Sequence, residues 1–409
     1  MTLDQSYYYS SLRRLFRKRD VYRHNLWSTK KDAKTMIEQI AYNVDNLNDD
    51  FISLHIRNSG SINIVSAANI ETDIVLRNIN RFLQKFYKVC QADRNMIIRQ
   101  VNALLQESCE YWILRLDIED FYGSITRESL INKIFDDGTM SLRSRRLLKK
   151  TFDMLSSARL YGLPRGLSIS ARLSEIYMRD FDNFVIRAKE VYFYRRYVDD
   201  IIIFLHKEPS SFITKIETKL KGLGLKLNPD KIYNEFIPGK KGAHLTPSPF
   251  DYLGYKFTFS NYGNSREWRK ISLAISQSKI KRIKSRVAKS FLEFSRNYDI
   301  SLLRDRIKFL TGNYRLNRNK NGVLKAGIYF NYPYLSSDKD LQDLDLFLRK
   351  RLFSNRGTIG TALRNHLSMI TRRQLAKYSF KEGYSQKLVY SFGYSRMREI
   401  TKCWKYDKT

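Results

Sequence analysis

The spacing of apolar and polar positions divides the chain into helical and strand-like stretches. Residues 1–50 carry apolar side chains at helical intervals among many Lys and Arg residues, which predicts basic amphipathic helices. Residues 51–75 are rich in β-branched side chains around a turn at 58–60, which predicts a hairpin of short strands. Helical spacing then resumes over 79–105. We therefore expect this part of the chain to be helical apart from one hairpin.

Two apolar strand candidates further along the chain each lead to acidic residues. The stretch 111–116 leads into Asp117, and the stretch 191–197 leads to the pair Asp199 and Asp200. Helices are expected between these strands. Downstream, the pattern predicts a helix over 211–223, a strand over 250–259 and, from 272 onward, helices with a break around 317–322.

The charge of the chain points to a polyanionic partner. The 409 residues include 74 Lys and Arg against 41 Asp and Glu, a formal net charge of +33. Nucleic acid is the first candidate, because charge repulsion of this size destabilises a compact state unless an anionic ligand offsets it. A merely soluble basic surface is the alternative. The 27 Tyr and 24 Phe would mostly form the core, while exposed ones could stack on unpaired bases.

The three cysteines and the lack of long apolar stretches narrow the class of protein further. Cys90, Cys109 and Cys403 are too few and too far apart for a disulfide framework or a zinc cluster. No stretch approaches the roughly 18 apolar residues of a membrane span, and the first residues lack the apolar core of a signal peptide. We expect a cytoplasmic protein that makes no membrane contact.

The acidic residues at the strand ends are candidate metal ligands. An isolated carboxylate such as Asp117 is usually a helix cap or a turn residue, and turn chemistry could also explain Asp199 and Asp200. Two adjacent acids between apolar strands, however, repel each other unless a cation offsets their charge. Two-metal catalysis needs carboxylates that converge from neighbouring strands. Because strand side chains alternate, Asp199 and Asp200 cannot be equivalent, so we assign Asp199 as the bridging ligand with Asp117, and Asp200 as the supporting ligand.

Five motifs over about residues 51–260 resemble, in their order, those of reverse transcriptases. They are the segment from Asp117 to Tyr122, the Gly-Leu-Pro-Arg-Gly loop with the helix start at 162–170, the Tyr-Val-Asp-Asp segment at 197–200, the Leu-Lys-Leu-Asn segment at 225–228 with Lys231, and the Tyr-Leu-Gly-Tyr segment at 252–255. Each motif is weak alone, and the order of all five makes the resemblance specific.

The resemblance implies a right-hand polymerase with fingers, palm and thumb. The implied fold class is α+β, with an antiparallel palm sheet and a helical C-terminal region. Two Mg²⁺ ions, with Mn²⁺ as an alternative, would be held by Asp117, Asp199 and Asp200, with Ile118 part of both the metal and the nucleotide sites. Tyr122 matches a steric gate whose ring collides with a ribose 2′-hydroxyl and so favours deoxynucleotides. An ordinary core tyrosine is the alternative.

Other nucleotide contacts follow from the resemblance less directly. Lys231 matches a lysine that can protonate the departing pyrophosphate, and a solvated lysine is the alternative. Arg165 stands where glutamine is common in the family, beside Gly166, and could contact either the nucleotide or the template backbone. The fingers hairpin usually offers a cation to the triphosphate, but residues 61–64 are uncharged here. Arg57 and Arg77 flank the hairpin and are our substitutes, with basic surface residues as the alternative.

Primer and template contacts are expected downstream of the palm. The segment Tyr252, Leu253 and Gly254 resembles the primer grip. From residue 280 apolar positions recur every three or four residues with cations between them, so one helix face packs and the other is basic. At the position of a polymerase thumb, that face would bind duplex phosphates through Lys281, Arg282 and Lys284; a solvated helix face is the alternative.

The predicted domains are a fingers and palm domain with basic N-terminal helices over 1–262, a thumb over 263–334 and a helical extension over 335–409. The extension lacks the carboxylate set of an RNase H and the cysteines of a zinc-type endonuclease. This compact organisation resembles stand-alone bacterial reverse transcriptases, and residues 306–332 resemble defence-associated enzymes, including the kind that works in a two-polymerase system.

These resemblances imply a template, a partner set and a biological role. The implied template is a noncoding RNA, the implied substrates are dNTPs, and the implied product is DNA made in antiviral defence in a bacterial cytoplasm, alone, as a homo-oligomer or with a second reverse transcriptase. Two alternatives remain open. One is a retron-like or intron-like enzyme, and the other is a non-catalytic RNA-binding scaffold that retains the polymerase fold.

Overall fold

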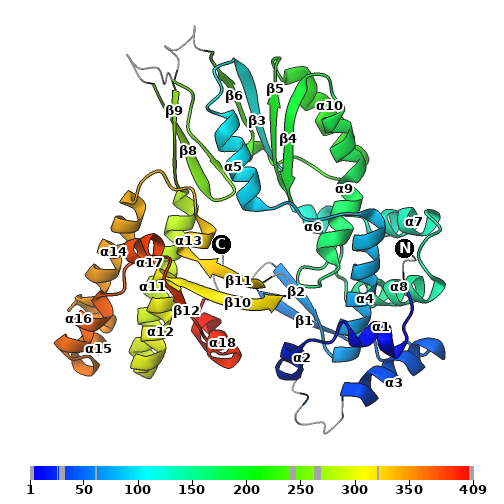
Figure 1. Ribbon diagram of the computed structural model, residues 1–409, viewed down its shortest axis with the longest axis horizontal. Helices are drawn as coiled ribbons and strands as arrows, with labels where there is room; N and C mark the ends of the chain where they lie inside the picture. Colours follow the sequence, from blue (N-terminus) through cyan, green and yellow to red (C-terminus); the bar gives the residue numbers. More distant parts are fainter. Residues whose placement is uncertain are drawn as a thin grey trace. The chain divides into compact units, whose positions relative to one another are not determined.

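The computed structural model describes residues 4–24, 26, 33–59, 62–239, 246–261, 269–319 and 322–404 (Figure 1). They form two compact units. Unit 1 comprises residues 1–94 and 110–237, and unit 2 comprises residues 95–109 and 238–409. Both units combine helices with mainly antiparallel sheets, as an α+β fold requires. No helix in the described ranges is both long enough and apolar enough to cross a membrane.

The acid-bearing strands of unit 1 form one four-stranded sheet. Its strands are β3 (Tyr111–Asp117), β4 (Val191–Tyr197), β5 (Asp200–Leu205) and β6 (Tyr233–Ile237), in the order β4-β5-β3-β6. Leu114 and Leu116 of β3 and Ile201 and Ile203 of β5 are buried in the main core of the unit, where they meet buried residues of the helices. Because side chains alternate along a strand, the other face of the sheet carries Arg115, Asp117 and Asp200.

Helices surround this sheet and a separate hairpin in unit 1. Alongside the sheet lie α9 (Ser170–Ile186) and α10 (Ser210–Gly222) (Figure 1). The hairpin consists of β1 (Leu54–Ser59) and β2 (Ile62–Ala67). The remaining helices are α1 (Tyr9–Arg13), α2 (Lys18–Arg23), α3 (Ala33–Asp45), α4 (Ile70–Tyr87), α6 (Phe121–Ser124), α7 (Arg127–Asp136), α8 (Leu142–Ser157) and the 3₁₀ turn Pro229–Lys231.

Unit 2 is built on two long helices, α11 (Gln277–Asn297) and α12 (Ile300–Thr311), which pack against each other. Its strands are β7 (Phe250–Tyr252), β8 (Tyr255–Asn261) and β9 (Arg269–Ile275) in one sheet, and β10 (Asn313–Asn319), β11 (Gly322–Gly327) and β12 (Val389–Tyr390) in another. The other helices are α5 (Arg94–Leu104), α13 (Ile328–Asn331), α14 (Lys339–Leu352), α15 (Gly357–His366), α16 (Met369–Ala376), α17 (Phe380–Ser385) and α18 (Tyr394–Lys402).

The last seventy or so residues pack closely on the rest of unit 2. The buried carboxylate of Asp345 on α14 accepts hydrogen bonds from the Ser379 hydroxyl and from the Phe380 backbone N–H, both at 2.6 Å. The indole of Trp404 donates to the backbone carbonyl of Arg286 on α11 at 3.0 Å. Residues 263–334 and 335–409 therefore lie in one compact unit, and unit 1 ends at residue 237. The division into fingers and palm, thumb and extension stays a prediction.

Several predicted elements differ from the structure in length or type. Residues 70–75 belong to helix α4 and not to the hairpin, because Asn69 caps that helix by accepting from the Thr72 backbone N–H. The helix predicted over 79–105 is two helices, α4 and α5, and the strand predicted over 250–259 is the hairpin β7–β8. Residues 272–275 are strand, and the predicted break at 317–322 lies within the hairpin β10–β11; its Lys320 and Asn321, and Gly60 of the first predicted turn, lie outside the described residues.

Candidate active site

The strand register brings the predicted acids together at one end of the four-stranded sheet. Asp117, the last residue of β3, pairs directly with Asp200, the first residue of β5. Asp199 lies one residue earlier, in the two-residue turn that links β4 to β5. The two neighbouring acids are thus not equivalent, since Asp199 occupies the turn and Asp200 the strand.

Backbone hydrogen bonds hold this end of the sheet from two sides. The Ile118 N–H donates to the Asp199 carbonyl at 3.2 Å, which ties the segment after β3 to the turn. On the other side, the Asn228 N–H donates to the Asp117 carbonyl at 2.8 Å, and the Glu119 N–H donates to the Lys226 carbonyl at 2.9 Å. The segments predicted as the first, third and fourth motifs therefore meet at one place, and Ile118 takes part through its backbone.

Two cations neutralise the carboxylates. The Lys231 ammonium lies 2.8 Å from Oδ2 of Asp117, although half of the lysine side chain is exposed. A guanidinium nitrogen of Arg115 lies 2.8 Å from Oδ1 of Asp200. Arg115 was missing from the sequence prediction. The available signal was its spacing, because a residue two positions before Asp117 must lie on the same face of the strand.

Asp199 lies in a less favourable environment than its neighbours. Burial raises the pKa of its carboxyl above the usual range, and the nearby carboxylates of Asp200 and Asp117 raise it further. These Coulomb effects show that the three acids are close enough to interact. The ionised form of Asp199 therefore needs a cation nearby.

The donor set of the site suits a hard divalent cation. Carboxylate oxygens are the ligands that Mg²⁺ prefers, and three acids here carry more negative charge than their surroundings compensate at Asp199. In the described part of the chain, however, no three His, Cys, Asp or Glu side chains are arranged so that they could hold a metal ion. Lys231 and Arg115 each engage one carboxylate, so Asp117 and Asp200 would have to turn from these partners toward a metal.

The turn that carries Asp199 has a strained backbone and is fixed by a hydrogen bond from a buried arginine. Val198 has a φ of +62°, a left-handed conformation that a β-branched residue rarely adopts. Its carbonyl accepts a hydrogen bond from the buried guanidinium of Arg196 at 3.0 Å. The same guanidinium binds both carboxylate oxygens of Asp182 at 2.8 Å and one oxygen of Glu175 at 2.8 Å. The turn is thus anchored to helix α9 through one buried arginine.

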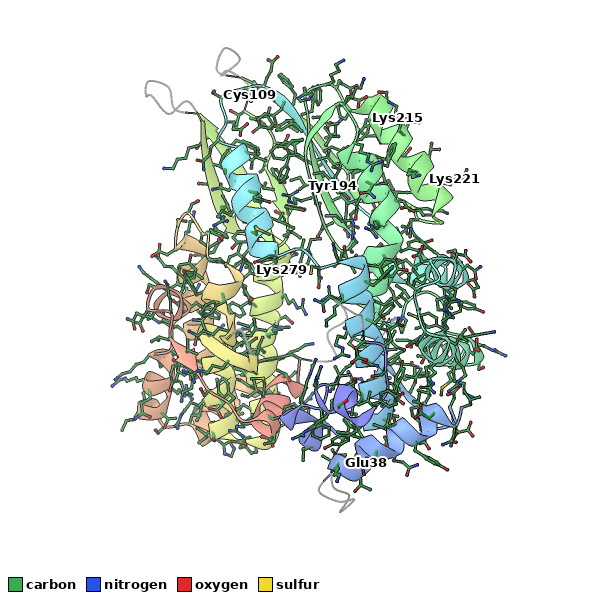
Figure 2. All side chains as sticks on the ribbon, turned by 45° about the vertical axis from the view of Figure 1, so that its right-hand side comes forward. Glu38, Cys109, Tyr194, Lys215, Lys221 and Lys279 are labelled. Carbon is green, nitrogen blue, oxygen red and sulfur yellow. The ribbon has the colours of Figure 1, made fainter. Side chains whose placement is uncertain are left out.

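Tyr194 completes this buried network. Its side chain is labelled in Figure 2, and its hydroxyl donates to Oδ1 of Asp182 at 2.6 Å. Burial raises the pKa of its phenol well above the usual value, so the hydroxyl stays a donor. None of Arg196, Glu175, Asp182 and Tyr194 was predicted as a site residue, because each looks like an ordinary surface or strand position in the sequence.

A pocket of about 250 Å³ lies in unit 1, and Asp199 is close enough to Tyr122 in its lining to help raise the pKa of that phenol. Its lining residues come from β2, from the segment after β3 and from the loop before α9; they include Asn63, Asp120, Tyr122, Arg159, Tyr161 and Arg165. Burial raises the pKa of the Tyr122 phenol, and a hydrogen bond with Ser174 opposes that shift. Arg165 lies 3.6 Å from the Asp120 carboxylate. The structure thus brings two of the predicted nucleotide-binding residues, Tyr122 and Arg165, to one pocket.

The loop that carries Arg165 is seated on the hairpin strand β2. The Val65 N–H donates to the Arg165 carbonyl at 2.8 Å. Gly166 follows with a φ of +108°, and a Cβ there would lie 2.4 Å from the Val65 carbonyl oxygen. Only glycine fits this position, so Gly166 has a structural role beside the pocket.

The two arginines proposed as triphosphate contacts differ in burial and in ion pairing. Arg57 on β1 is exposed, and its role stays a prediction. Arg77 is 5% exposed, and its guanidinium binds Asp20 and Asp73 at 2.6 Å. The prediction for Arg77 is therefore contradicted, because its charge is used to join helices α2 and α4.

The predicted primer and template residues lie in unit 2. Tyr252 is buried, and Leu253 and Gly254 form a two-residue turn between β7 and β8 in which both residues have positive φ. On α11, Lys281 and Arg282 are exposed, whereas the Lys284 ammonium lies 5.6 Å from the ring centre of Phe347. These assignments stay predictions.

Comparison with known proteins bears on the segment that holds the acid-bearing sheet. Residues 66–257 match the family described as reverse transcriptase (RNA-dependent DNA polymerase). The matched segment, a little under half of the chain, is similar to a reverse transcriptase domain. The match implies a polymerase palm fold, and the four-stranded sheet with its acids is the part of the segment that corresponds to it. The five motifs that indicated this family are those that the structure assembles around the acids and the pocket and in the β7–β8 turn.

Solved structures similar to this chain include two yeast telomerases. Apo telomerase from Candida tropicalis, truncated from its C-terminal domain, is 13% identical with a TM-score of 0.35, over 55% of this chain and 59% of that one. Telomerase from Candida albicans in complex with a TWJ fragment of telomeric RNA is 12% identical with a TM-score of 0.37, over 80% and 52%. This chain thus spans only part of their length. No curated protein is detectably similar in sequence.

Proposed function

We propose that this chain is an RNA-templated DNA polymerase that extends a primer 3′ end with deoxynucleotides. The observation that carries the proposal is the register that pairs Asp117 with Asp200 and places Asp199 in the adjoining turn, within a reverse transcriptase domain. In this proposal β1 and β2 belong to the fingers, the four-stranded sheet is the palm, and α11 belongs to a thumb.

The chain's own residues have distinct roles in the proposed reaction. Asp117, Asp199 and Asp200 would hold two divalent ions, Mg²⁺ in the first instance, which supply activation of the primer hydroxyl and charge neutralisation at the phosphates. Asp199 depends most on that charge, since burial and its neighbours disfavour its ionised form. The ring of Tyr122 would exclude ribonucleotides from the pocket that it lines.

Lys231 would change partners during the cycle. Its ammonium binds Asp117 at 2.8 Å but is half exposed, so it can turn toward a bound triphosphate. A positive charge at that place stabilises the pyrophosphate as it leaves and can donate a proton to it. Arg165, which lines the pocket, would contact the nucleotide or the template.

The biological setting is part of the proposal and is supported by sequence resemblance alone. We propose a noncoding RNA as template and a role in antiviral defence in the bacterial cytoplasm, with a second reverse transcriptase or a second copy of the chain as a partner. A retron-like or intron-like enzyme would use the same active site with another RNA.

Deoxynucleotide incorporation by the purified full chain with its co-purifying RNA tests the proposal. Labelled DNA should form with Mg²⁺ and disappear on chelation and in an Asp199→Ala, Asp200→Ala double variant. A matched control is Asp50→Ala with Asp136→Ala, since both acids are exposed and neither lines the pocket nor pairs with Lys231 or Arg115; it should keep activity. If neither the wild type nor the control makes DNA while all variants bind the same RNA, a non-catalytic scaffold replaces the polymerase.

A further inference from the structure

The C-terminal helices contain a stretch of chain with no acidic residue. Between Asp345 and Glu382 there are nine Lys and Arg residues and not one Asp or Glu. Across the whole chain, acids make up 41 of 409 residues, about one in ten. The net positive charge per residue of this acid-free stretch is therefore higher than that of the chain as a whole.

Most of these cations are exposed on neighbouring helices of unit 2. α14 packs against both α15 and α16, and the three helices lie together in Figure 1. We call their exposed cations the α14–α16 surface: Arg349, Lys350, Arg351, Arg356, Arg364, Arg373 and Lys377. Within the described ranges, none of these seven side chains forms an ion pair. Among the described residues, no carboxylate therefore pairs with these cations, although the guanidinium of Arg351 lies 5.3 Å from the ring centre of Phe347.

One end of this surface has the features of an anion site. Among the residues that the structure describes, no side chain caps the N-terminus of α15, whose first backbone N–H groups and helix dipole favour an anion. The preceding loop is held close, because a Cβ at Gly360 would lie 2.5 Å from the Asn355 backbone. The side-chain oxygen of Asn355 in that loop accepts from the guanidinium of Arg372 on α16 at 3.4 Å.

Arg372 provides a second, independent feature that favours an anion at this place. Its residue surface is 4% exposed, and its Nε has no hydrogen-bond partner among the described residues. No acid pairs with it in the described part of the chain. A buried guanidinium without a counter-charge costs free energy, and an anion at the adjacent helix N-terminus would offset that cost.

We propose that the α14–α16 surface binds the phosphate backbone of RNA, with one phosphate at the N-terminus of α15 beside Arg372. This inference rests on the proposed function in one respect, the choice of RNA as the polyanion. Arginines predominate on the surface, and arginine suits phosphate oxygens better than lysine does. A membrane is less suitable, because interfacial helices need a broad apolar face. The exposed large apolar residues of these helices and their ends are only Leu346, Phe353, Met369 and Ile370 among the described residues.

Salt-dependent RNA binding by the full chain tests the surface. The test variant is Arg356→Gln, Arg364→Gln, Arg373→Gln. The control is Lys189→Gln, Lys207→Gln, Lys221→Gln, which removes the same charge from exposed positions of unit 1, with Lys221 labelled in Figure 2. The probe is a fluorescent 40-nucleotide RNA hairpin, whose anisotropy is followed from about 0.05 to 0.5 M KCl, because counterion release depends on the logarithm of salt concentration.

The expected result is a specific loss of phosphate contacts. Each lost contact lowers the slope of log K against log salt by roughly 0.7 to 0.9, so the test variant should lose about two and bind roughly ten- to hundredfold more weakly near physiological salt. The control should change the slope by less than one contact. Equal effects in the two variants would overturn the proposal, because they would indicate general charge alone.

Two further arms separate the remaining explanations. Arg372→Gln should lower RNA affinity at a temperature where circular dichroism shows it folded, and Arg372→Lys should retain part of that affinity; if both bind as the wild type does, the phosphate beside Arg372 is excluded.

Vesicles with about 30% anionic lipid test the membrane. Loss of vesicle binding with unchanged RNA binding in the triple variant would overturn the proposal. DNA synthesis at saturating template should persist in the triple variant, so failure of the surface and failure of the polymerase remain distinguishable.

Discussion

Replacing Arg196 with Met should both destabilise unit 1 and slow nucleotide incorporation. The guanidinium makes bonds of 2.8 Å to Asp182 and Glu175 and one of 3.0 Å to the Val198 carbonyl in the catalytic turn. Methionine fills much of the same volume but leaves two carboxylates without a counter-charge. The Val198 turn, already strained at a φ of +62°, also loses its anchor.

The magnitude follows from the burial of each partner. Removing one partner of a fully buried pair costs about 3–5 kcal/mol. The side chains of Glu175 and Asp182 are 15% and 23% exposed, against 3% for Arg196, so partial hydration of the acids reduces the expected loss to about 2–4 kcal/mol. A displacement of Asp199 by an ångström should lower kcat roughly a hundredfold.

Urea unfolding and single-nucleotide incorporation at saturating substrate measure the two effects separately. Tyr194→Phe is the matched control, since it removes one hydrogen bond to Asp182 and leaves Arg196 in place. It should cost about 1 kcal/mol with little change in kcat. If Arg196→Met loses stability while kcat stays within twofold of the wild type, the anchoring of the turn by Arg196 is refuted and its role is purely structural.

Three further substitutions test other parts of the site. Asp199→Asn should abolish DNA synthesis yet raise the Tm of the metal-free protein at pH 7. A carboxyl whose pKa is raised on folding stabilises the protein below its unfolded pKa, and this stabilisation is lost as pH rises through the folded pKa. The wild type should therefore be more stable than Asp199→Asn only at low pH. A lower Tm of Asp199→Asn than of the wild type at pH 7 would contradict this reasoning. Gly166→Ala should destabilise unit 1 by about 2 kcal/mol or more in urea, since its Cβ would meet the Val65 carbonyl at 2.4 Å; an unchanged midpoint would count against that packing. Tyr122→Val should raise the ratio of kcat/KM for ribonucleotides to that for deoxynucleotides at least tenfold, and an unchanged ratio would make Tyr122 an ordinary core residue.

The basic character of the chain connects these site predictions to the proposed RNA surface. A net charge of +33 destabilises a compact fold through self-repulsion, and bound anions offset that cost. Within unit 1, acids such as Asp20, Asp73 and Asp182 neutralise buried arginines. The α14–α16 surface has no such partners among the described residues, so a bound polyanion is the natural source of its counter-charge.

The sequence by itself determined the features that depend on local periodicity and on the order of motifs. Apolar strands ending in Asp117 and leading to Asp199 and Asp200 predicted the sheet and its acids, and the register of β3 with β5 agrees. Predictions from the same patterns were wrong where another local interaction, such as a helix cap, decided the secondary structure. At Asn69, for instance, a side-chain cap begins helix α4 within a stretch of β-branched residues.

Only the tertiary structure decided which polar side chains meet. Arg77 and Arg196 both look like surface cations in the sequence, yet they are buried because acids distant in the sequence, such as Asp20 for Arg77, reach their guanidinium groups. Arg115 joins the active site because β5 pairs with β3 and brings Asp200 within reach. Such contacts depend on nonlocal pairing, whereas hydrophobic periodicity reports only which face of an element is buried. The acids could therefore be predicted from the sequence, and the cations that hold them could not.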